Sequence, residues 1–479
     1  MTNFSNTRRA RFSASLFVIV LTAVMVVVYS GCGSAPKYKI TGTVTFAGAA
    51  FPGVTVKLSG DASAAATTDA NGSYSFNDLQ RGTYPVTHSL MGYTFSPPYR
   101  PAFLKGSDAI GWNFSGSCTT MVAASLHTYY LKSDGTLWVW GNNGNGQFGN
   151  GTAAAPFNSA PVQISGLSGV IAIVAGGNHT VYLKTDGTVW AAGLNTNGQL
   201  GDGTTAQRIT PVRVSGLSNV TAVIAGDAYT VALKSDGTVW SWGKNLNGQL
   251  GKGTSGVGTD SSVPVQATGL TGITSIDAGD DFTVALKSDS TVWAWGNNSK
   301  GQLGDGTTTQ RDSPVQVQAS LGVALSGMST IIAGGSFTIA MKNDGTFWAW
   351  GNNTDGQFCN GVTVATNSYP VAIGIESLGI TGISTGSDHT AFIKSDATVW
   401  TCGNNSDGQL GNSDITGTSQ SIPQATGLTS VTVVSAGNQD TVAVKSDGTL
   451  WAWGNNANGQ LGDEALAPTI ELSPVPVQF

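Results

Sequence analysis

The sequence contains little charge, little cysteine and only one long hydrophobic run. Charged residues make up 10% of the 479 positions, against roughly 25% in typical soluble proteins. The net charge is -6, so binding to a phosphate backbone by counterion release is not expected and we predict no nucleic-acid partner. Low charge does not indicate disorder here, because 40% of the residues are hydrophobic and include 13 Trp and 17 Phe.

Four cysteines are too few for a disulfide framework of the kind that holds small secreted domains together. If Cys32 is modified, as argued below, Cys118, Cys359 and Cys402 remain, and an odd number leaves at least one thiol unpaired within the chain. Two interpretations of Cys359 and Cys402 stay open. They form a bridge if their Cα atoms lie within about 7 Å, or each is a small buried apolar residue.

The one long apolar run covers residues 14–29 and follows Arg8, Arg9 and Arg11. Basic residues before a short apolar segment are typical of a secretory signal. The run is shorter than the roughly 20 residues that span a bilayer, so we favour cleavage over an uncleaved membrane anchor. The Arg8-Arg9 pair also suggests twin-arginine export as a minor alternative.

Residues Tyr29-Ser30-Gly31-Cys32 resemble a bacterial lipobox, with Tyr29 in place of the usual leucine. The resemblance implies that residues 1–31 are a lipoprotein signal peptide, that Cys32 is lipidated, and that residues 32–37 form a short linker. Acyl chains contribute about 0.8 kcal/mol per buried methylene, so a lipid anchor needs no spanning helix. We therefore expect an exported protein that is lipid-anchored to a bacterial membrane or cell surface.

Residues 38–115 contain short alternating segments separated by glycine and Asn-Gly turns, which predict an antiparallel β-sandwich. The stretch TDANGSYSFNDLQRGTYPV resembles the carboxypeptidase regulatory-like family, whose members usually serve as spacers. Asp69, Asn71 and Asp78 suit turns, and we prefer that role to calcium binding.

A repeat of about 52 residues fills the chain from residue 118 to residue 479. Its marker is the first tryptophan of a TVWSWG-like segment, found at Trp138, Trp190, Trp240, Trp293, Trp348, Trp400 and Trp451. Each unit contains four candidate strands, which is typical of a propeller blade. The elements HTVYLKTDGTVW and NGQLGDGT resemble the regulator of chromosome condensation repeat. The resemblance implies an all-β fold, a seven-bladed β-propeller over 118–479 with a small N-terminal β-sandwich domain.

Details of the blades follow from the repeat. An Asp-Gly pair predicts a tight hairpin in five units, whereas Ser290 and Ala397 replace the glycine in the other two, at a cost of about 1 kcal/mol if the position is left-handed. We expect the seven marker tryptophans to pack between blades.

Ring closure can also be predicted from the repeat. Because a short gap precedes the next unit, we assign each PV strand to the blade of the following unit, so that residues 474–479 complete the first blade. Deletion of 474–479 should then expose an edge and lower the cooperativity of unfolding.

No catalytic motif is visible, and we expect neither an enzyme nor a cofactor. His127, His179 and His389 share one repeat position with Tyr229, Phe282, Phe337 and Asp440, which indicates packing and not a shared metal site. Seven lysines likewise share a position beside the hairpin. Loops such as NNGNGQ offer amides where a calcium site would offer carboxylates.

The units differ most between the GDGT-like loop and the PV strand, and variable loops on a rigid scaffold commonly carry recognition. We therefore propose these loops as binding elements of a non-enzymatic, monomeric protein with a protein partner. The candidate residues are Gln207, Arg208, Gln310, Arg311, Asp312 and Tyr369. Binding or processing of an envelope glycan is the alternative. Guanine-nucleotide exchange, the activity of the eukaryotic founding member, is a minor one, because no long insertion interrupts the repeats.

Overall fold

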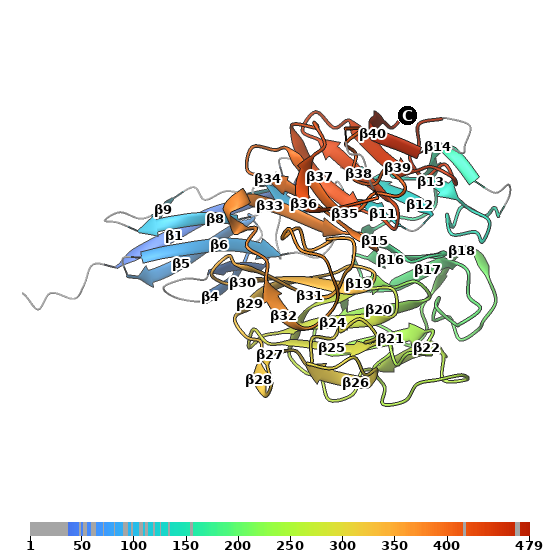
Figure 1. Cartoon of the computed structure of the whole chain (residues 1–479), viewed down its shortest axis with the longest axis horizontal. Helices are drawn as coiled ribbons and strands as arrows, with labels where there is room; N and C mark the ends of the chain where they lie inside the picture. The colour runs from blue at the N-terminus through green and yellow to red at the C-terminus, as the bar shows by residue number, and fades with distance from the viewer. Residues whose placement is uncertain are drawn as a thin grey trace, which may run out of the picture.

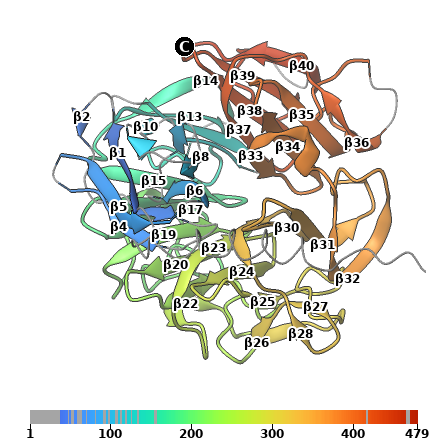
Figure 2. The same ribbon diagram turned by 90° about the vertical axis from the view of Figure 1, so that its left-hand side faces the viewer.

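Seven four-stranded antiparallel sheets surround a common axis in the computed structural model, so the predicted seven-bladed propeller is confirmed. Figure 2 shows these blades around the axis, with the N-terminal strands on the viewer's side. The structure describes residues 37–46, 49–50, 55–58, 64–69, 71–80, 82–89, 94–96, 99–104, 109–110, 114–117, 120–124, 126–132, 135–153, 157–414, 418–464 and 470–479. The signal peptide, Cys32 and Cys118 lie outside these residues.

The N-terminal part consists of two sheets. One contains β1 (Tyr38–Phe46), β2 (Ala49–Ala50), β5 (Ser73–Leu79), β7 (Thr94–Ser96), β9 (Ala109–Ile110) and β10 (Phe114–Ser117). The other contains β3 (Thr55–Leu58), β4 (Ala64–Thr67), β6 (Gly82–Ser89) and β8 (Tyr99–Leu104). Alternating residues such as Ile40, Val44 and Val56 are buried, as expected for strands with one face on a core. The Asp69 carboxylate accepts hydrogen bonds from the backbone N–H groups of Asn71 and Ser73, both at 2.8 Å, which is a turn-forming role.

Each blade is a meander of four strands, here called the first to fourth strand in chain order. Blade 1 contains β11 (Thr120–Ala123), β12 (His127–Leu131), β13 (Leu137–Asn142) and β14 (Phe157–Ile164). Blade 2 contains β15 (Val170–Ala175), β16 (His179–Lys184), β17 (Val189–Gly193) and β18 (Arg208–Arg213). Blade 3 contains β19 (Val220–Ala225), β20 (Tyr229–Lys234), β21 (Val239–Gly243) and β22 (Ser261–Gln266). Blades 4 and 5 are β23 (Ile273–Ala278), β24 (Phe282–Lys287), β25 (Val292–Gly296), β26 (Arg311–Gln316); and β29 (Met328–Ala333), β30 (Phe337–Lys342), β31 (Phe347–Asn353), β32 (Val364–Ala372). Blades 6 and 7 are β33 (Ile380–Thr385), β34 (His389–Lys394), β35 (Val399–Asn404), β36 (Ser419–Ala425); and β37 (Val431–Ala436), β38 (Asp440–Lys445), β39 (Leu450–Asn455), β40 (Ile470–Pro476).

The first strands form the inner ring of the propeller. Each contacts the first strand of the next blade, and β37 of blade 7 contacts β11 of blade 1, so the ring is closed. The connections between blades carry a short hairpin, β27 (Gln318–Ser320) and β28 (Val323–Ala324), and the 3-10 helix η1 (Glu376–Leu378). The part of the chain that the structure describes contains no helix of the length and apolar character needed to span a membrane.

The prediction that each PV strand joins the following blade is wrong. The fourth strand pairs with the third strand of its own unit, as in β21 with β22 and β39 with β40. The preceding loop is long, but it is folded compactly by its own hydrogen bonds. In blade 3, for example, Asn245 accepts from the Leu250 backbone N–H at 3.1 Å and donates to the Thr254 carbonyl at 2.7 Å. The folded loop returns the chain to its own sheet. The long separation in sequence between the third and fourth strands therefore does not mean that they lie in different blades.

Side chains, rather than an exchanged strand, therefore join blade 7 to blade 1. The Ala123 backbone N–H donates to the Ser435 hydroxyl at 3.1 Å. The Phe479 ring packs against blade 1, with its centroid 5.3 Å from Trp138 and 6.1 Å from Trp140. Deletion of residues 474–479 should therefore remove part of β40, the strand that pairs with β39, and the contact of Phe479 with blade 1.

Candidate functional site: two unlike faces of the propeller

The meander gives the propeller two different faces. Loops between the first and second strands and loops between the third and fourth strands lie together on one face, which we call the loop face. Tight hairpins between the second and third strands lie with the connections between blades on the other, the turn face. Contacts such as Asn145 with Asn178 on the loop face and Thr185 with Gly169 on the turn face show these groupings.

The turn face carries the repeated Lys and marker Trp residues. The ammonium group of Lys342 lies 4.1 Å from the ring centroid of Trp348, a cation–π distance, and the Trp348 indole N–H donates to Thr346 at 3.3 Å. The marker tryptophans are half-buried here. The indoles that pack fully between blades are those two residues further along the same strand, Trp140, Trp242, Trp295, Trp350 and Trp453.

On the loop face, the loop between the third and fourth strands of each blade reaches the next blade, and we call it the latch loop. In blade 2 the Gln199 carbonyl accepts hydrogen bonds from two residues of blade 3, the Trp242 indole N–H at 2.9 Å and the Thr230 hydroxyl at 3.0 Å. The buried amide of Asn195 holds the loop by accepting from the Leu200 backbone N–H at 3.0 Å. The equivalent carbonyls are those of Gln147, Gln249, Gln302, Gln357, Gln409 and Gln460.

These latch loops also close the ring. The Gln460 carbonyl of blade 7 accepts from the Trp140 indole at 2.7 Å and from the Thr128 hydroxyl at 2.9 Å, both in blade 1.

The amide side chains of the NNGNGQ-type loops form hydrogen bonds that hold the loops themselves. Among the described residues, no group of three or more His, Cys, Asp or Glu is arranged to hold a metal ion. Sequence reasoning missed the latch because its partners come from different units.

Two of the predicted binding residues are held inside their own latch loops. Arg208 donates from Nε to Asp202 at 2.8 Å and forms a second contact through its terminal nitrogen at 2.7 Å. Arg311 is bound to Asp305 in the same way, at 2.7 Å for both contacts. Burial opposes ionisation of each aspartate, but hydrogen bonds from the Thr204 and Thr307 hydroxyls, followed by those from the two arginines, lower the pKa of Asp202 and of Asp305.

The other predicted binding residues lie at the rim of the loop face. Gln207 and Gln310 are exposed. Gln310 donates to Ser255 at 2.9 Å and to Asp312 at 3.1 Å, which joins the latch loops of blades 3 and 4. Tyr369 is partly buried over Gly306 of the neighbouring loop, so close that an added Cβ at Gly306 would lie 2.3 Å from the tyrosine ring.

The shared His position is a packing site between blades. His127, His179 and His389 are fully buried, and the Nε2 atom of each lies 2.8 to 3.1 Å from a threonine hydroxyl of the next blade. Burial lowers the pKa of His127 to about 3 and the pKa values of His179 and His389 to about 4, so these imidazoles are neutral. At the same position in blade 7, burial raises the pKa of Asp440 well above its ordinary value.

The charges of the propeller are divided unequally between its faces. On the turn face, eight basic residues accompany seven described acidic ones. They are Lys132, Lys184, Arg213, Lys234, Lys287, Lys342, Lys394 and Lys445, with Asp186, Asp236, Asp289, Asp344, Glu376, Asp396 and Asp447. The loop face has five basic and fourteen acidic residues. They are Arg208, Lys244, Lys252, Lys300 and Arg311, with Asp202, Asp227, Asp260, Asp280, Asp281, Asp305, Asp312, Asp355, Asp388, Asp407, Asp414, Asp463, Glu464 and Glu471.

The acidic excess is strongest near the axis of blades 3 to 6. Burial, followed by repulsion from Asp227, Asp281 and Asp388, raises the pKa of Asp280 to about 6. Lys244 partly offsets this charge by binding Asp281 at 3.1 Å. Carboxylates gathered on one face together produce a negative potential that attracts a cationic partner. Sorting the charges of each repeat by position would have revealed this asymmetry from the sequence.

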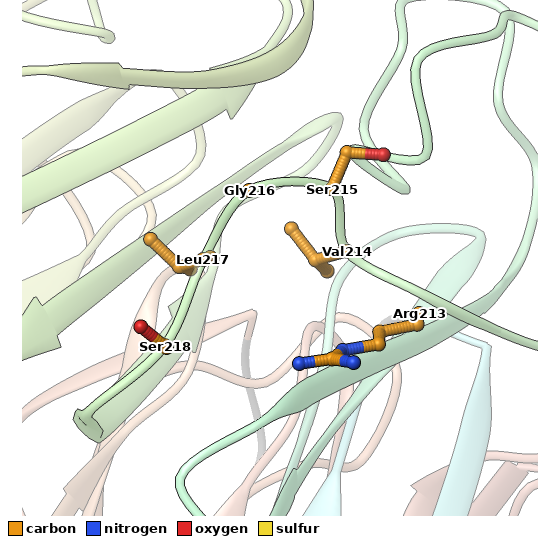
Figure 3. A pocket seen from close by; sticks show the side chains of 6 residues that line it. All are labelled: Arg213, Val214, Ser215, Gly216, Leu217 and Ser218. Atoms are coloured by element: carbon orange, nitrogen blue, oxygen red, sulfur yellow. The ribbon is translucent and has the colours of Figure 1, made fainter.

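A shallow hollow of about 480 Å³ lies on the turn face, along the connection from blade 2 to blade 3. Its lining residues run consecutively from Arg213 to Ser218, and Figure 3 shows them along a single bend of the chain. Small-molecule sites usually bring polar groups together from several elements. This hollow does not, and we assign it no function.

Comparison with known proteins agrees with this architecture. The model of the RCC1-like domain matches residues 99–328 and 166–479. The chain belongs to the RCC1-like domain family. The carboxypeptidase regulatory-like domain matches residues 39–96, which identifies the N-terminal sandwich.

Among individual RCC1-like relatives, the chain is 31% identical over 366 residues to the ultraviolet-B receptor UVR8 of Arabidopsis thaliana, covering 74% of this chain and 69% of UVR8. It is 29% identical over 371 residues to the mitochondrial RCC1 domain-containing protein RUG3 of the same plant, covering 76% and 71%. Two solved structures share the fold with a TM-score of 0.63. Human WBSCR16 is 22% identical and covers 71% of this chain and 94% of its own, and yeast RCC1 (Prp20) bound to Kap60 is 20% identical and covers 75% and 85%.

Proposed function

We propose that this RCC1-like protein is an exported, lipid-anchored binding protein that holds a basic protein partner on its acidic loop face, without catalysing a reaction. The observation that carries the proposal is the division of charge described above. The loop face has nine more acidic than basic residues, whereas the turn face is close to neutral. A one-signed face raises the rate of encounter with an oppositely charged partner and repels partners of the same sign.

The path of the chain supports an outward orientation of the loop face. The sandwich leads into β11, whose first residue lies at the turn-face end of blade 1. In Figure 1 the sandwich projects from the side of the propeller that carries η1 and the β27–β28 hairpin, which is the turn face. With a lipid on Cys32, the sandwich would act as a spacer and the loop face would point away from the membrane. Anionic lipid headgroups would favour the same orientation by repelling the acidic face.

Export is supported by the lipobox-like residues 29–32 and by a disulfide between Cys359 and Cys402. Disulfides persist in oxidising compartments outside the cytosol. Protein binding is supported by the relatives, since yeast RCC1 (Prp20) has been solved bound to Kap60 and its binding to Gsp1p and histones has been characterised.

The binding proposal is tested by affinity capture from an envelope extract with the full-length protein in detergent. A loop-face variant, D227N/D280N/D414N/E471Q, removes four acidic charges without breaking any side-chain ion pair described above. A matched turn-face variant, D186N/D236N/D289N/D396N, removes four charges and keeps each Asx turn. We expect the recovery of a specific basic protein to fall at least tenfold with the loop-face variant and to remain unchanged with the turn-face variant. Equal retention by both variants would contradict the proposal.

The anchor is tested separately, by fractionating cells that produce the wild type or C32S. The wild type should be found with membranes and incorporate a radiolabelled fatty acid. C32S should incorporate none. Labelling of C32S equal to that of the wild type would contradict lipidation at Cys32.

A further inference from the structure

One of the seven contacts between neighbouring blades contains a disulfide, Cys359–Cys402. At four of these contacts, here called seams, the latch loop has a glycine, the third strand of the next blade has a tryptophan and its second strand has an alanine. At the seam between blades 2 and 3 these residues are Gly201, Trp242 and Ala232, all of them buried. The equivalent sets are Gly251, Trp295 and Ala285; Gly304, Trp350 and Ala340; and Gly411, Trp453 and Ala443.

The glycine and the tryptophan depend on each other sterically. A Cβ atom added at Gly201 would lie 2.7 Å from the Trp242 indole nitrogen, and one added at Gly411 would lie 2.5 Å from that of Trp453. The glycine is therefore required wherever the indole is present. It also adopts the left-handed backbone, with a φ of 68° at Gly201, which glycine accepts most readily.

All three positions change together at the seam between blades 5 and 6. The glycine becomes Cys359, the tryptophan becomes Cys402, and the alanine becomes Phe392. Cys359 keeps the left-handed backbone, with a φ of 61°. Its Cα lies 5.5 Å from that of Cys402, and the two are joined by a disulfide. Phe392 is fully buried and belongs to the same apolar cluster as Cys359 and Cys402.

This exchange removes the indole hydrogen bond that the latch carbonyl accepts at five of the other six seams. The Gln357 carbonyl still accepts from the Thr390 hydroxyl at 2.7 Å, but the nearest Cys402 atom is a sulfur 3.7 Å away, which carries no proton in the disulfide. Phe392 has no donor. The seam between blades 1 and 2 also lacks the indole, yet Tyr182 supplies a hydroxyl there, 3.3 Å from the Phe148 carbonyl.

We propose that the Cys359–Cys402 disulfide takes the place of the indole hydrogen bond at this seam, so that closure of the propeller ring between blades 5 and 6 depends on oxidation. In the reduced chain this seam has neither the covalent bond nor an aromatic donor, which makes it the place where the ring opens first. The inference concerns the scaffold, goes beyond the proposed binding function and does not depend on the identity of any partner.

The chemistry is thiol–disulfide exchange with a donor that carries a disulfide, such as a dithiol oxidoreductase of an oxidising compartment. One cysteine thiolate attacks the donor disulfide, and the second cysteine then displaces the donor sulfur. The two cysteines lose two protons and two electrons, and the donor disulfide becomes two thiols. Both sulfurs are buried in the closed ring, with Cys359 3% exposed and Cys402 0% exposed, so the bond forms before the seam closes.

The test compares thermal unfolding of three forms of the full-length protein, each refolded with and without a strong thiol reductant. The wild type should unfold at a temperature lower by roughly 5 °C or more after reduction. C359S/C402S should unfold like the reduced wild type under both conditions. C359G/C402W/F392A, which copies the three residues of the other seams, should be insensitive to the reductant and at least as stable as C359S/C402S.

Hydrogen exchange on the wild type locates the effect. Reduction should increase exchange first in residues 355–362 and 399–404, on the two sides of the seam. An unchanged unfolding temperature after verified reduction would overturn the proposal, as would increased exchange at all seven seams together. If C359G/C402W/F392A does not fold, the unfolding temperatures of the oxidised and reduced wild type still test the proposal. C359G/C402A/F392Y, which copies the seam between blades 1 and 2, then replaces the variant that does not fold.

Discussion

The two faces of this propeller are made from the same seven repeats, but they differ in how strictly the repeats are kept. On the turn face, nearly every unit presents the same Lys, the same hairpin and the same half-buried tryptophan, and the charges almost balance. On the loop face, the buried Asn and Gln of the latch loop are constant, while the exposed residues vary and the charged residues are mainly acidic. The difference indicates that stability requires the buried side of each loop and leaves the exposed side free for recognition.

The largest expected effect separates the two tryptophans of one strand. Trp242→Ala removes a fully buried indole and its bond to the latch loop, and should lower the free energy of unfolding by about 3–5 kcal/mol. Trp240→Ala removes a half-buried indole of the turn face and should cost about 1–2 kcal/mol. Denaturant titration of both variants measures the difference. Equal losses would remove the distinction between latch and turn-face tryptophans.

The next prediction concerns acid sensitivity at the seams of the loop face. Burial lowers the pKa of His179 to about 4, against an ordinary value of about 6.5. Because the unfolded chain takes up this proton first, the histidine's contribution to stability is present above about pH 6.5 and is lost as the pH falls toward 4. His179→Phe should reduce the loss of stability between pH 7 and pH 5 by about 2 kcal/mol. Phenylalanine already occupies the equivalent position in two other blades, as Phe282 and Phe337.

Denaturant midpoints measured at several pH values check this prediction. Lys184→Met, on the same strand but at the turn face, serves as the control and should leave the pH dependence unchanged. A wild-type profile retained by His179→Phe would show that the pKa of the imidazole is the same in the folded and the unfolded protein.

The smallest effect is expected at the hairpins of the turn face. Ser290 and Ala397 both have a φ of 63°, in the left-handed region that Gly237 occupies with a φ of 76°. Ser290→Gly and Ala397→Gly should therefore raise the free energy of unfolding by up to about 1 kcal/mol each. Gly237→Ala should have the opposite effect. Thermal unfolding of the three variants decides, and a loss of stability in both glycine variants would show that the backbone there is not strained.

Much of the fold could be predicted from the sequence because its determinants lie within one unit. The spacing of Trp138 and its six equivalents indicated seven blades, and the Asp-Gly pairs indicated the hairpins. The pairing of the fourth strand was predicted wrongly, because a gap length does not show that Asn245 folds the intervening loop back. Contacts between units were harder still. No local pattern shows that the Trp242 indole binds the Gln199 carbonyl, and the exchange of Gly and Trp for Cys359 and Cys402 is meaningful only once these positions are known to meet.

The most direct test of the acidic loop face is a hydrogen-exchange footprint of the full-length protein with its captured partner. We predict protection of the loops around Asp227, Asp280 and Asp388, with no change in the hairpins that contain Asp186 and Asp396. Binding should also weaken steeply as salt is raised from 50 to about 300 mM, because attraction between exposed charges is screened over about 10 Å at 0.1 M salt. Protection confined to the turn face, with binding indifferent to salt, would contradict the account.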